Sequence, residues 1–278
     1  MHADPVIIAD RIAHIAGSQV TQLRTLGGGF WRAELADGTP VFAKTCPATT
    51  EAVGLRWLAQ GGAATPDVIG HDDQLLVLRW VEEAAGDPRS LGRMLARLHA
   101  SGAPAFGSPP PSAGAGWIGS APMSYADMAE WPQFFVEHRV LPYLAAARTA
   151  GSVTAAQAAA VQAVCDRIDT LAGPPVTPAR LHGDLWGGNV LWSVGGGVLI
   201  DPAAHGGHPE SDIAMLLLFP PSGAAQIIAG YKSVAPLPAG WRQRVDLHQL
   251  YPLLVHSVLF GGGYAAAVGR ATGRLLGA

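Results

Sequence analysis

One stretch, residues 181–191, limits what this chain can fold into more than any other. Its sequence is LHGDLWGGNVL, so apolar residues flank a polar loop that carries His182, Asp184 and Asn189 in the order H-x-D-x-x-x-x-N. Twelve residues after Asn189, Asp201 ends the apolar run at residues 198–200, which we expect to be a short strand. A histidine and an aspartate alone would be a weak signal. The complete loop, followed at this distance by a second aspartate, is a specific one.

This set of oxygen-bearing side chains suits phosphoryl transfer from ATP. The spacing from His182 to Asn189 is the one that protein kinases use in their catalytic loop. A carboxylate must accept the proton of the attacking hydroxyl, and further oxygens must hold Mg²⁺ against the phosphates. We therefore predict Asp184 as the base and Asn189 and Asp201 as magnesium ligands, since two protein ligands plus phosphate oxygens suffice for this hard ion. His182 is expected to be structural.

The N-terminal part of the chain supplies a candidate nucleotide-binding turn. Gly27, Gly28 and Gly29 separate two predicted strands, and glycine lets backbone N–H groups approach a phosphate with no side chain in the way. Such a turn is weak evidence alone, but Lys44 follows on a third strand, where kinases place a phosphate-binding lysine. Glu51, near the start of a predicted helix, could pair with Lys44. The alternatives are a solvated lysine and an acidic residue that only complements the helix dipole.

The hydrophobic pattern predicts an α+β fold with two lobes. Five short segments are predicted to be strands: residues 20–26, 30–35, 41–44, 66–70 and 75–80. We expect residues 1–82 to form a nucleotide-binding lobe, a five-stranded antiparallel sheet plus a helix. Residues 83–278 should form a mostly helical lobe that carries the catalytic and substrate-binding residues. Trp80 and Val81 lead into a polar stretch between the lobes, a hinge where adenine could stack and bond to the backbone.

Several helices and one loop are expected in the C-terminal part. Ser90 is predicted to cap a helix, and residues 101–123, rich in Gly, Pro, Ser and Ala, are predicted to form a long loop. One helix should begin at Trp131 and run to about residue 144 with a kink at Pro142. A further helix is expected over residues 153–171.

Composition and charge exclude several classes of protein. Hydrophobic residues make up 49% of the 278 and charged residues 14%, which excludes a disordered chain and indicates extensive burial. The net charge of −3, with no block of Lys and Arg, gives no sign of a nucleic-acid or anionic-membrane partner. We expect no signal peptide and no membrane-spanning run, and Cys46 and Cys165 form no zinc motif. A cytoplasmic monomer is therefore expected.

The segment after Asp201 carries further polar residues. Asp212 should open a helix, with its buried carboxylate accepting hydrogen bonds from backbone N–H groups of the catalytic loop. His205 and His208 suggest a metal site, but no third ligand is spaced to join them, so we do not favour it. Kinases place an activation or substrate segment here, so we expect His205 to lie on the substrate side of the site.

The chain resembles the fructosamine (ketosamine) kinases, a branch of the protein-kinase-like fold related to the aminoglycoside and choline kinases. The motifs that carry this resemblance are HGDLWGGN at 182–189, LIDPA at 199–203, GHPESD at 207–212 and LFGGGY at 259–264. The GGG turn at 27–29 and FAK at 42–44 are similar to the family's nucleotide lobe. The Trp-Gly-Gly run is unusual in the broader group, which makes the first motif the most specific.

The resemblance implies an ATP-dependent kinase that phosphorylates a ketosamine, small or protein-bound, at the 3-position of its sugar. The product is unstable and releases the amine, so the implied role is deglycation repair. The resemblance assigns the same roles as the residue patterns do: Asp184 is the base, Asn189 and Asp201 hold Mg²⁺, and Lys44 pairs with Glu51. It also implies that Trp186 stacks against the sugar or forms a wall of its pocket. Only seven residues separate Lys44 from Glu51, fewer than is usual in this family, and the glycine turn lacks the cysteine that some relatives carry.

Two other functions remain open from the sequence. An aminoglycoside- or choline-type phosphotransferase would use the same catalytic residues, although only a modest number of acidic residues is available for a polycationic substrate. A non-catalytic pseudokinase that binds nucleotide would not need Lys44, Asp184, Asn189 and Asp201, all of which this chain has.

Overall fold

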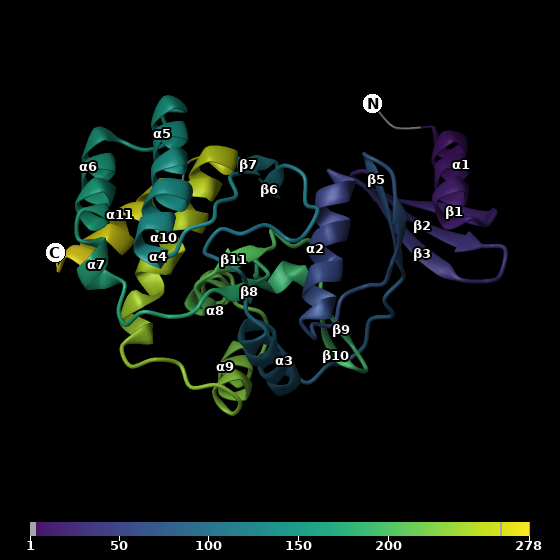
Figure 1. The fold of residues 1–278 in the computed structure, drawn as a ribbon. Helices are drawn as coiled ribbons and strands as arrows, with labels where there is room; N and C mark the ends of the chain where they lie inside the picture. The colour runs from purple at the N-terminus through teal and green to yellow at the C-terminus, as the bar shows by residue number, and fades with distance from the viewer. Residues whose placement is uncertain (1–3, 262, 278) are drawn as a thin grey trace.

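A five-stranded antiparallel sheet forms one end of the molecule and helices form the other (Figure 1). The computed structural model describes residues 4–261 and 263–277. The strands are β1 (Val20–Gly27), β2 (Phe30–Leu35), β3 (Pro40–Thr45), β4 (Val68–His71) and β5 (Leu75–Arg79). Their order in the sheet is β1-β2-β3-β5-β4. The predicted α+β class and the five-stranded antiparallel sheet are confirmed, while the division at residues 82 and 83 stays a prediction.

Two helices cover opposite faces of this sheet, and the alternation of side chains along a strand explains how. On β5, Leu75 and Val77 pack against α1 (Pro5–Ala16), whereas Leu76 and Leu78 pack against α2 (Ala48–Gln60). Successive residues of a strand point to opposite faces, so a strand buried on both faces reads as a continuous apolar run. The same alternation on β3 places Lys44 on the face that α2 covers.

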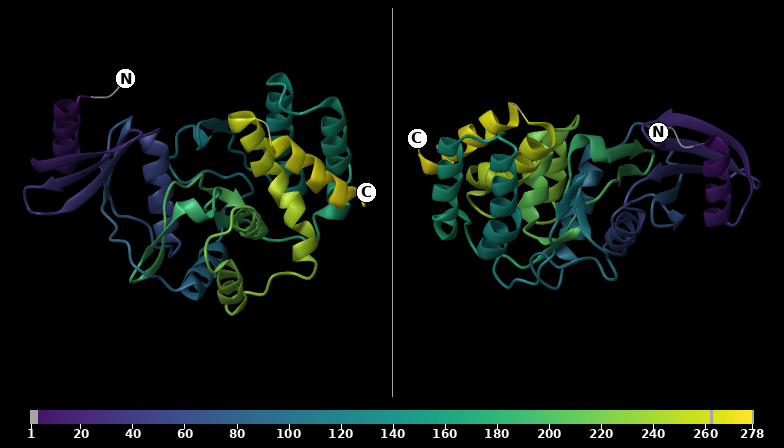
Figure 2. Two further views of the ribbon diagram at one scale, coloured as in Figure 1. Left: turned by 180° about the vertical axis from the view of Figure 1, so that it is seen from behind. Right: turned by 90° about the horizontal axis from the view of Figure 1, so that it is seen from above.

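The rest of the chain is mostly helical. Its longer helices are α3 (Pro88–Ala100), α5 (Leu141–Thr149), α6 (Ala155–Cys165), α8 (Pro209–Leu218), α9 (Ala224–Lys232), α10 (Trp241–Phe260) and α11 (Gly263–Leu276). Two further helices, α4 (Trp131–Phe134) and α7 (Ile168–Leu171), are a single turn each. Figure 2 shows α11 and the C-terminus at the end of the molecule opposite to the sheet. None of the described helices is long and apolar enough to span a bilayer.

Three pairs of short strands lie among these helices. Strand β8 (Ala179–Leu181) pairs with β11 (His205–Gly207), and β9 (Val190–Ser193) pairs with β10 (Gly196–Leu199). The first pair places the chain before residue 182 beside the chain after residue 204, and the second brings residue 190 opposite residue 199. The loop at 182–189 and the segment at 200–204 are thereby held side by side.

Two expectations about loops and caps are corrected. The helix expected to be capped by Ser90 begins at Pro88, because the Asp87 carboxylate accepts hydrogen bonds from the backbone N–H groups of Arg89 and Ser90. Residues 101–123 are not all loop, since β6 (Gly116–Ile118) and β7 (Ala121–Met123) form a hairpin with a two-residue turn. Both the carboxylate of Asp87 and the hydroxyl of Ser90 could cap a helix, and the prediction chose Ser90, which is wrong.

Two expectations about helices are also corrected. The helix expected from Trp131 to residue 144 contains a π-helical segment at Phe135–Val140, between α4 and α5. Pro142 has no N–H to donate to the carbonyl four residues earlier, so the regular hydrogen-bond ladder cannot continue through this segment. The helix expected over residues 153–171 is interrupted after Cys165 and resumes as α7.

Candidate active site

One buried carboxylate, that of Asp212, holds the loop at residues 182–189 in place. Asp212 accepts hydrogen bonds from the backbone N–H groups of His182 (2.8 Å) and Gly183 (2.9 Å). The Nε2 atom of His99 lies 3.2 Å from the same carboxylate. Burial would raise the pKa of Asp212, but the hydrogen bond from His99 and the nearby histidines outweigh it and lower the pKa. The predicted contacts of Asp212 are present, although α8 begins at Pro209 rather than at Asp212.

The path of the loop depends on a glycine and a histidine. Gly183 has a φ of +83°, and a Cβ there would lie 2.1 Å from the carbonyl oxygen of Ala203, so only glycine fits. His182 Nε2 donates to the carbonyl of Ile200 at 2.9 Å, and its Nδ1 accepts from the N–H of Asp184 at 3.2 Å. His182 therefore ties the loop to the segment that precedes Asp201, and its structural role stays a prediction.

The predicted base and the predicted magnesium ligands lie together. Asn189 Nδ2 donates to the backbone oxygen of Asp184 at 2.8 Å and to its Oδ2 at 3.2 Å, which leaves the Asn189 amide oxygen available as an acceptor. Asp201 has a φ of +55°, a conformation that costs energy in any residue other than glycine and is often found at functional sites. An amide oxygen and a carboxylate are oxygen donors of the kind that Mg²⁺ prefers, so these residues fit that ion.

Asp184 has the electrostatic surroundings of a general base. Burial raises the pKa of its carboxyl, and the nearby His182 and His256 and the hydrogen bond from Asn189 only partly offset this. A carboxylate with a raised pKa is a stronger base and accepts a proton more readily. The pKa therefore moves in the direction that proton abstraction from a hydroxyl requires.

Lys44 is paired with two carboxylates inside the protein. Its Nζ lies 2.8 Å from Glu51 on α2 and 2.6 Å from Asp201, and only 6% of the residue is exposed. Burial would lower the pKa of Lys44, but the charges of Glu51 and Asp201 outweigh it and raise the pKa, so the ammonium stays protonated. The contact predicted between Lys44 and Glu51 is present despite the short sequence separation, because α2 follows β3 directly.

Two pockets meet at Lys44 and Asp201. The larger, of about 340 Å³, is lined by polar residues of the loop, including Asp184, and by aromatic side chains. The smaller, of about 270 Å³, is mainly apolar, and Trp80 and Val81 of the predicted hinge line it. Its other lining residues include Phe30, Phe42, Leu78, Leu191 and Ile200. The two pockets share Lys44 but differ in character, since the smaller is apolar and the larger contains carboxylates. A nucleotide needs such a difference, because its base is apolar and its phosphates are charged.

The glycine turn lies at the end of β1 and adopts a conformation that favours glycine. Gly27, Gly28 and Gly29 have φ values of +91°, +60° and +83°. The next residue, Phe30, lies opposite Lys44 in the register of β2 and β3, and it lines the apolar pocket. The turn is therefore next to the pocket lining, where its N–H groups could face a phosphate.

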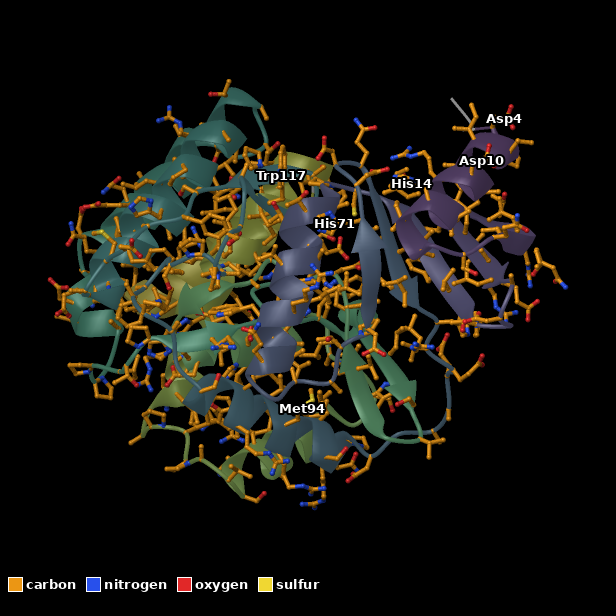
Figure 3. The ribbon with its side chains drawn as sticks, turned by 45° about the vertical axis from the view of Figure 1, so that its right-hand side comes forward. Asp4, Asp10, His14, His71, Met94 and Trp117 are labelled. Atoms are coloured by element: carbon orange, nitrogen blue, oxygen red, sulfur yellow. The ribbon has the colours of Figure 1, made fainter. Side chains whose placement is uncertain are left out.

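Several residues of the larger pocket were not predicted from the sequence, among them two aromatic side chains and a histidine. Trp117 comes from the hairpin of β6 and β7, and His256 and Phe260 come from α10. Figure 3 shows Trp117 beside α2, at the side facing the C-terminal helices. The length of the segment at 101–123 indicated that it could be functional, and Trp117 belongs to it. In contrast, nothing in the apolar pattern of α10 distinguished His256 from a histidine of the core.

The structure separates the predicted substrate residues. Trp186 lines the larger pocket with 40% of its surface exposed and contacts Phe219 edge to face. His205 is buried, its Nδ1 lies 2.8 Å from the carbonyl oxygen of Ala203, and it does not line either of the two pockets. Burial, followed by the charge of Arg139, lowers the pKa of His205 to about 3, so its ring is neutral. We therefore retain Trp186 and not His205 as a substrate contact.

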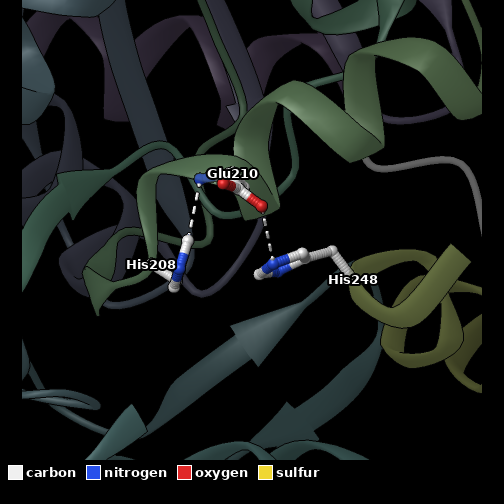
Figure 4. Close-up of side chains that lie close together, drawn as sticks. All are labelled: His208, Glu210 and His248. Atoms are coloured by element: carbon white, nitrogen blue, oxygen red, sulfur yellow. Dashed lines mark hydrogen bonds and ion pairs between the residues drawn. The ribbon is translucent and has the colours of Figure 1, made fainter. Parts of the chain in front are cut away.

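His208 joins a different cluster from the one considered in the sequence. It lies with Glu210 and His248, and Figure 4 shows the two rings on either side of the Glu210 carboxylate. His205 is not part of this cluster, so the pair considered from the sequence does not come together. The ligand atoms of His208, Glu210 and His248 lie within 4.8 Å of one another, close enough to hold a cation. However, Arg244 donates to both oxygens of Glu210, at 2.8 and 2.5 Å, and its positive charge disfavours a metal ion there.

Comparison with solved structures defines the class of protein. A choline kinase from Streptococcus pneumoniae shares the fold, with a TM-score of 0.64 over 98% of this chain and 99% of that one at 17% identity. A protein from Thermobifida fusca that is assigned as a fructosamine-3-kinase is much more similar. Its TM-score is 0.90 at 42% identity, over 98% of this chain and 99% of that chain. The fold is that of the protein-kinase-like phosphotransferases.

The family follows from sequence comparison. The model of the fructosamine kinase family matches residues 19–277, and the chain therefore belongs to this family of enzymes. A protein of Synechocystis assigned as a ketoamine kinase is 38% identical over 204 residues, which span 70% of this chain and 64% of that relative. One from Thermus thermophilus is 33% identical over 224 residues, which span 80% of this chain and 79% of the relative. The family expected from the sequence motifs is confirmed.

Proposed function

We propose that this chain is an ATP-dependent ketosamine kinase that phosphorylates the sugar hydroxyl at the 3-position. The observation that carries the proposal is the convergence of Asp184, Asn189, Asp201 and Lys44 at one pocket in a member of this family. Fructosamines and ribulosamines, free or attached to protein, are the proposed substrates, and deglycation is the proposed role. The proposed setting is the cytoplasm, with the chain as a monomer.

Each residue has a task that its surroundings support. Asp184 would accept the proton of the attacking hydroxyl, because its carboxylate faces the larger pocket and burial raises its pKa. Lys44 would contact the phosphates, since its ammonium lies where the two pockets meet. Asn189 and Asp201 would hold Mg²⁺, which supplies charge neutralisation of the phosphates when bound. Glu51 would keep Lys44 in place.

The nucleotide and the sugar would occupy different pockets. Adenine fits the apolar pocket beside Trp80 and Val81, where the hinge backbone offers hydrogen-bonding groups. The sugar fits the larger pocket, where Trp186 and Trp117 offer aromatic faces to its C–H groups and Asp184 offers a proton acceptor. Both pockets reach Asp201, so the transferred phosphoryl group would pass between them beside this residue.

The test is ADP release from Mg-ATP with fructose-lysine and ribulose-lysine, compared with kanamycin and choline. Turnover on a ketosamine, with nuclear magnetic resonance placing the phosphate at the 3-position, is the expected result. Turnover only on kanamycin or choline would keep the mechanism and overturn the proposed substrate. Absence of turnover on all four, with ATP still bound, would overturn the proposal.

Variants separate catalysis from binding. Asp184→Asn should lower turnover about 10²- to 10⁴-fold and leave ATP binding nearly unchanged, because only the proton acceptor is lost. Asp201→Asn should weaken the binding of Mg-ATP as well. If Asp184→Asn retained full activity, the assignment of the base would be wrong.

A further inference from the structure

Arg139 is a fully buried cation with no carboxylate partner. It is 2% exposed, and its Nη1 donates to the backbone oxygens of Ser124 at 2.8 Å and His138 at 3.0 Å. Its Nε and Nη2 atoms are buried and have no hydrogen-bond partner among the described residues, where no ion pair includes Arg139 either. A guanidinium stays charged in proteins, and an unpaired buried charge is strongly unfavourable.

The backbone around Arg139 explains why its guanidinium is held in this orientation. Pro142 cannot donate to the carbonyl of His138, four residues earlier, and Arg139 Nη1 donates to that carbonyl instead. Arg139 belongs to the π-helical segment, a form that is rare and frequent at functional sites. The rings of Phe134 and Tyr251 lie 4.6 and 5.5 Å from its guanidinium carbon, so cation–π contacts also fix its plane.

The unpaired edge of Arg139 is the edge that other arginines of this molecule use to bind carboxylates. Arg11, Arg244 and Arg274 each direct Nε and Nη2 at the two oxygens of one carboxylate. These two parallel N–H groups form a rigid fork suited to an anionic acceptor. In Arg139 the same fork has no acidic side chain opposite to it among the described residues.

Arg139 is also one of the residues that line a small cavity. Phe134 and Tyr251 line it as well, and its volume of about 30 Å³ corresponds to one or two water-sized positions. The buried hydroxyl of Tyr251 lies near that of Tyr143, so a ligand of the cavity would depend on Arg139 and not on this hydroxyl. Asp212 also lines the cavity, but its two carboxylate oxygens already accept hydrogen bonds from His99 and from the backbone N–H groups of His182 and Gly183.

We propose that this cavity binds a halide ion, with chloride as the physiological occupant, on Nε and Nη2 of Arg139. A single monoatomic ion fits the small volume, whereas a carboxylate-bearing metabolite or a phosphate needs more space. Water would satisfy the N–H groups but would leave the positive charge in place, and an anion removes both penalties. The site is separate from the proposed substrate pocket and does not depend on the proposed function.

The direct test uses bromide as the probe, because its anomalous scattering distinguishes it from water. Crystals of the full chain grown in sodium bromide should show an anomalous peak within hydrogen-bonding distance of Arg139 Nε and Nη2. Density without anomalous signal would mean water and would overturn the proposal. A peak that persists unchanged in Arg139→Met would overturn it as well, since the ion would then be held by other groups.

A second measurement requires no crystal. Thermal unfolding of the wild type in sodium chloride, compared with sodium gluconate at equal ionic strength, should show a midpoint about 2–4 °C higher in chloride. Arg180→Met is the matched control, because Arg180 also lies over an aromatic ring and has a buried Nε without a partner, but does not line this cavity. The chloride effect should survive in Arg180→Met and vanish in Arg139→Met. Equal midpoints of the wild type in both salts would refute the proposal.

Discussion

The buried ion pair of Glu210 and Arg244 gives a prediction whose size can be calculated. Burial would raise the pKa of Glu210, but hydrogen bonds from His248 and Arg244 outweigh it and lower the pKa from 4.5 to about 2. A difference of this size in pKa corresponds to about 3 kcal/mol of stability at neutral pH. Breaking a buried pair by removing one partner costs about 3–5 kcal/mol, because the other charge stays buried. Glu210→Gln should therefore lower the free energy of unfolding by about 3–4 kcal/mol.

The dependence on pH gives this prediction a second test. A lowered pKa means that the stabilisation is complete above pH 4.5, the ordinary value, and is lost as the pH falls towards about 2. Urea denaturation of the wild type and Glu210→Gln should therefore show the full difference at pH 7 and a shrinking difference below pH 4.5. A difference that stays constant down to pH 3 would contradict the reasoning.

Asp246→Asn is the matched control. Asp246 also accepts two hydrogen bonds from one arginine, Arg274, but the side chain of that arginine is 59% exposed. Exposed ion pairs contribute about 0–1 kcal/mol because water screens them. If Glu210→Gln cost no more than Asp246→Asn, burial would not be the cause of the effect and the calculation would be refuted.

Three further outcomes are expected. Lys44→Met should lower kcat/KM for ATP about 10- to 150-fold, because it removes a charge-assisted contact worth about 1.5–3 kcal/mol, and steady-state kinetics will measure this. Gly183→Ala should destabilise the protein by about 2–5 kcal/mol in urea denaturation, whereas Gly151→Ala, with positive φ but open space, should cost only about 1–2 kcal/mol. The acid limb of the pH–rate profile should have a midpoint above the ordinary aspartate pKa of 3.8, because burial raises the pKa of Asp184. A midpoint at or below 3.8 would contradict the last assignment.

The parts of the site that are local in sequence could be predicted. Asp184 and Asn189 belong to one loop, and Asp201 follows the hairpin of β9 and β10 that begins at the end of this loop, so their spacing alone indicates that they meet. The contact of Lys44 with Glu51 was predictable for a similar reason, since β3 leads directly into α2 and the alternation on β3 fixes the face of the lysine.

The parts that depend on distant segments could not be predicted. His256 reaches the larger pocket only because α10 packs beside the loop, and its neighbours in the sequence are those of an ordinary core helix. His205 has polar neighbours in the sequence and was expected near the substrate, but β11 pairs with β8 and buries it. Pro142 indicated a kink, whereas the burial of Arg139 beside it follows from the packing of Tyr251 on α10. The periodicity of apolar residues predicts which face of a helix or strand is buried, but it does not predict which other element will cover that face.

The double pairing of Lys44 has a consequence for the resting protein. An ammonium in water must shed its hydration shell before it can contact a phosphate, and that step opposes binding. Here the shell is already gone, because the side chain is buried and both of its partners are carboxylates. Under the proposed function, an incoming phosphate oxygen would exchange one anionic neighbour of the lysine for another, and the charge on Asp201 would become available to a cation at the same moment. Nucleotide and metal should consequently bind with positive cooperativity, each removing a competitor of the other.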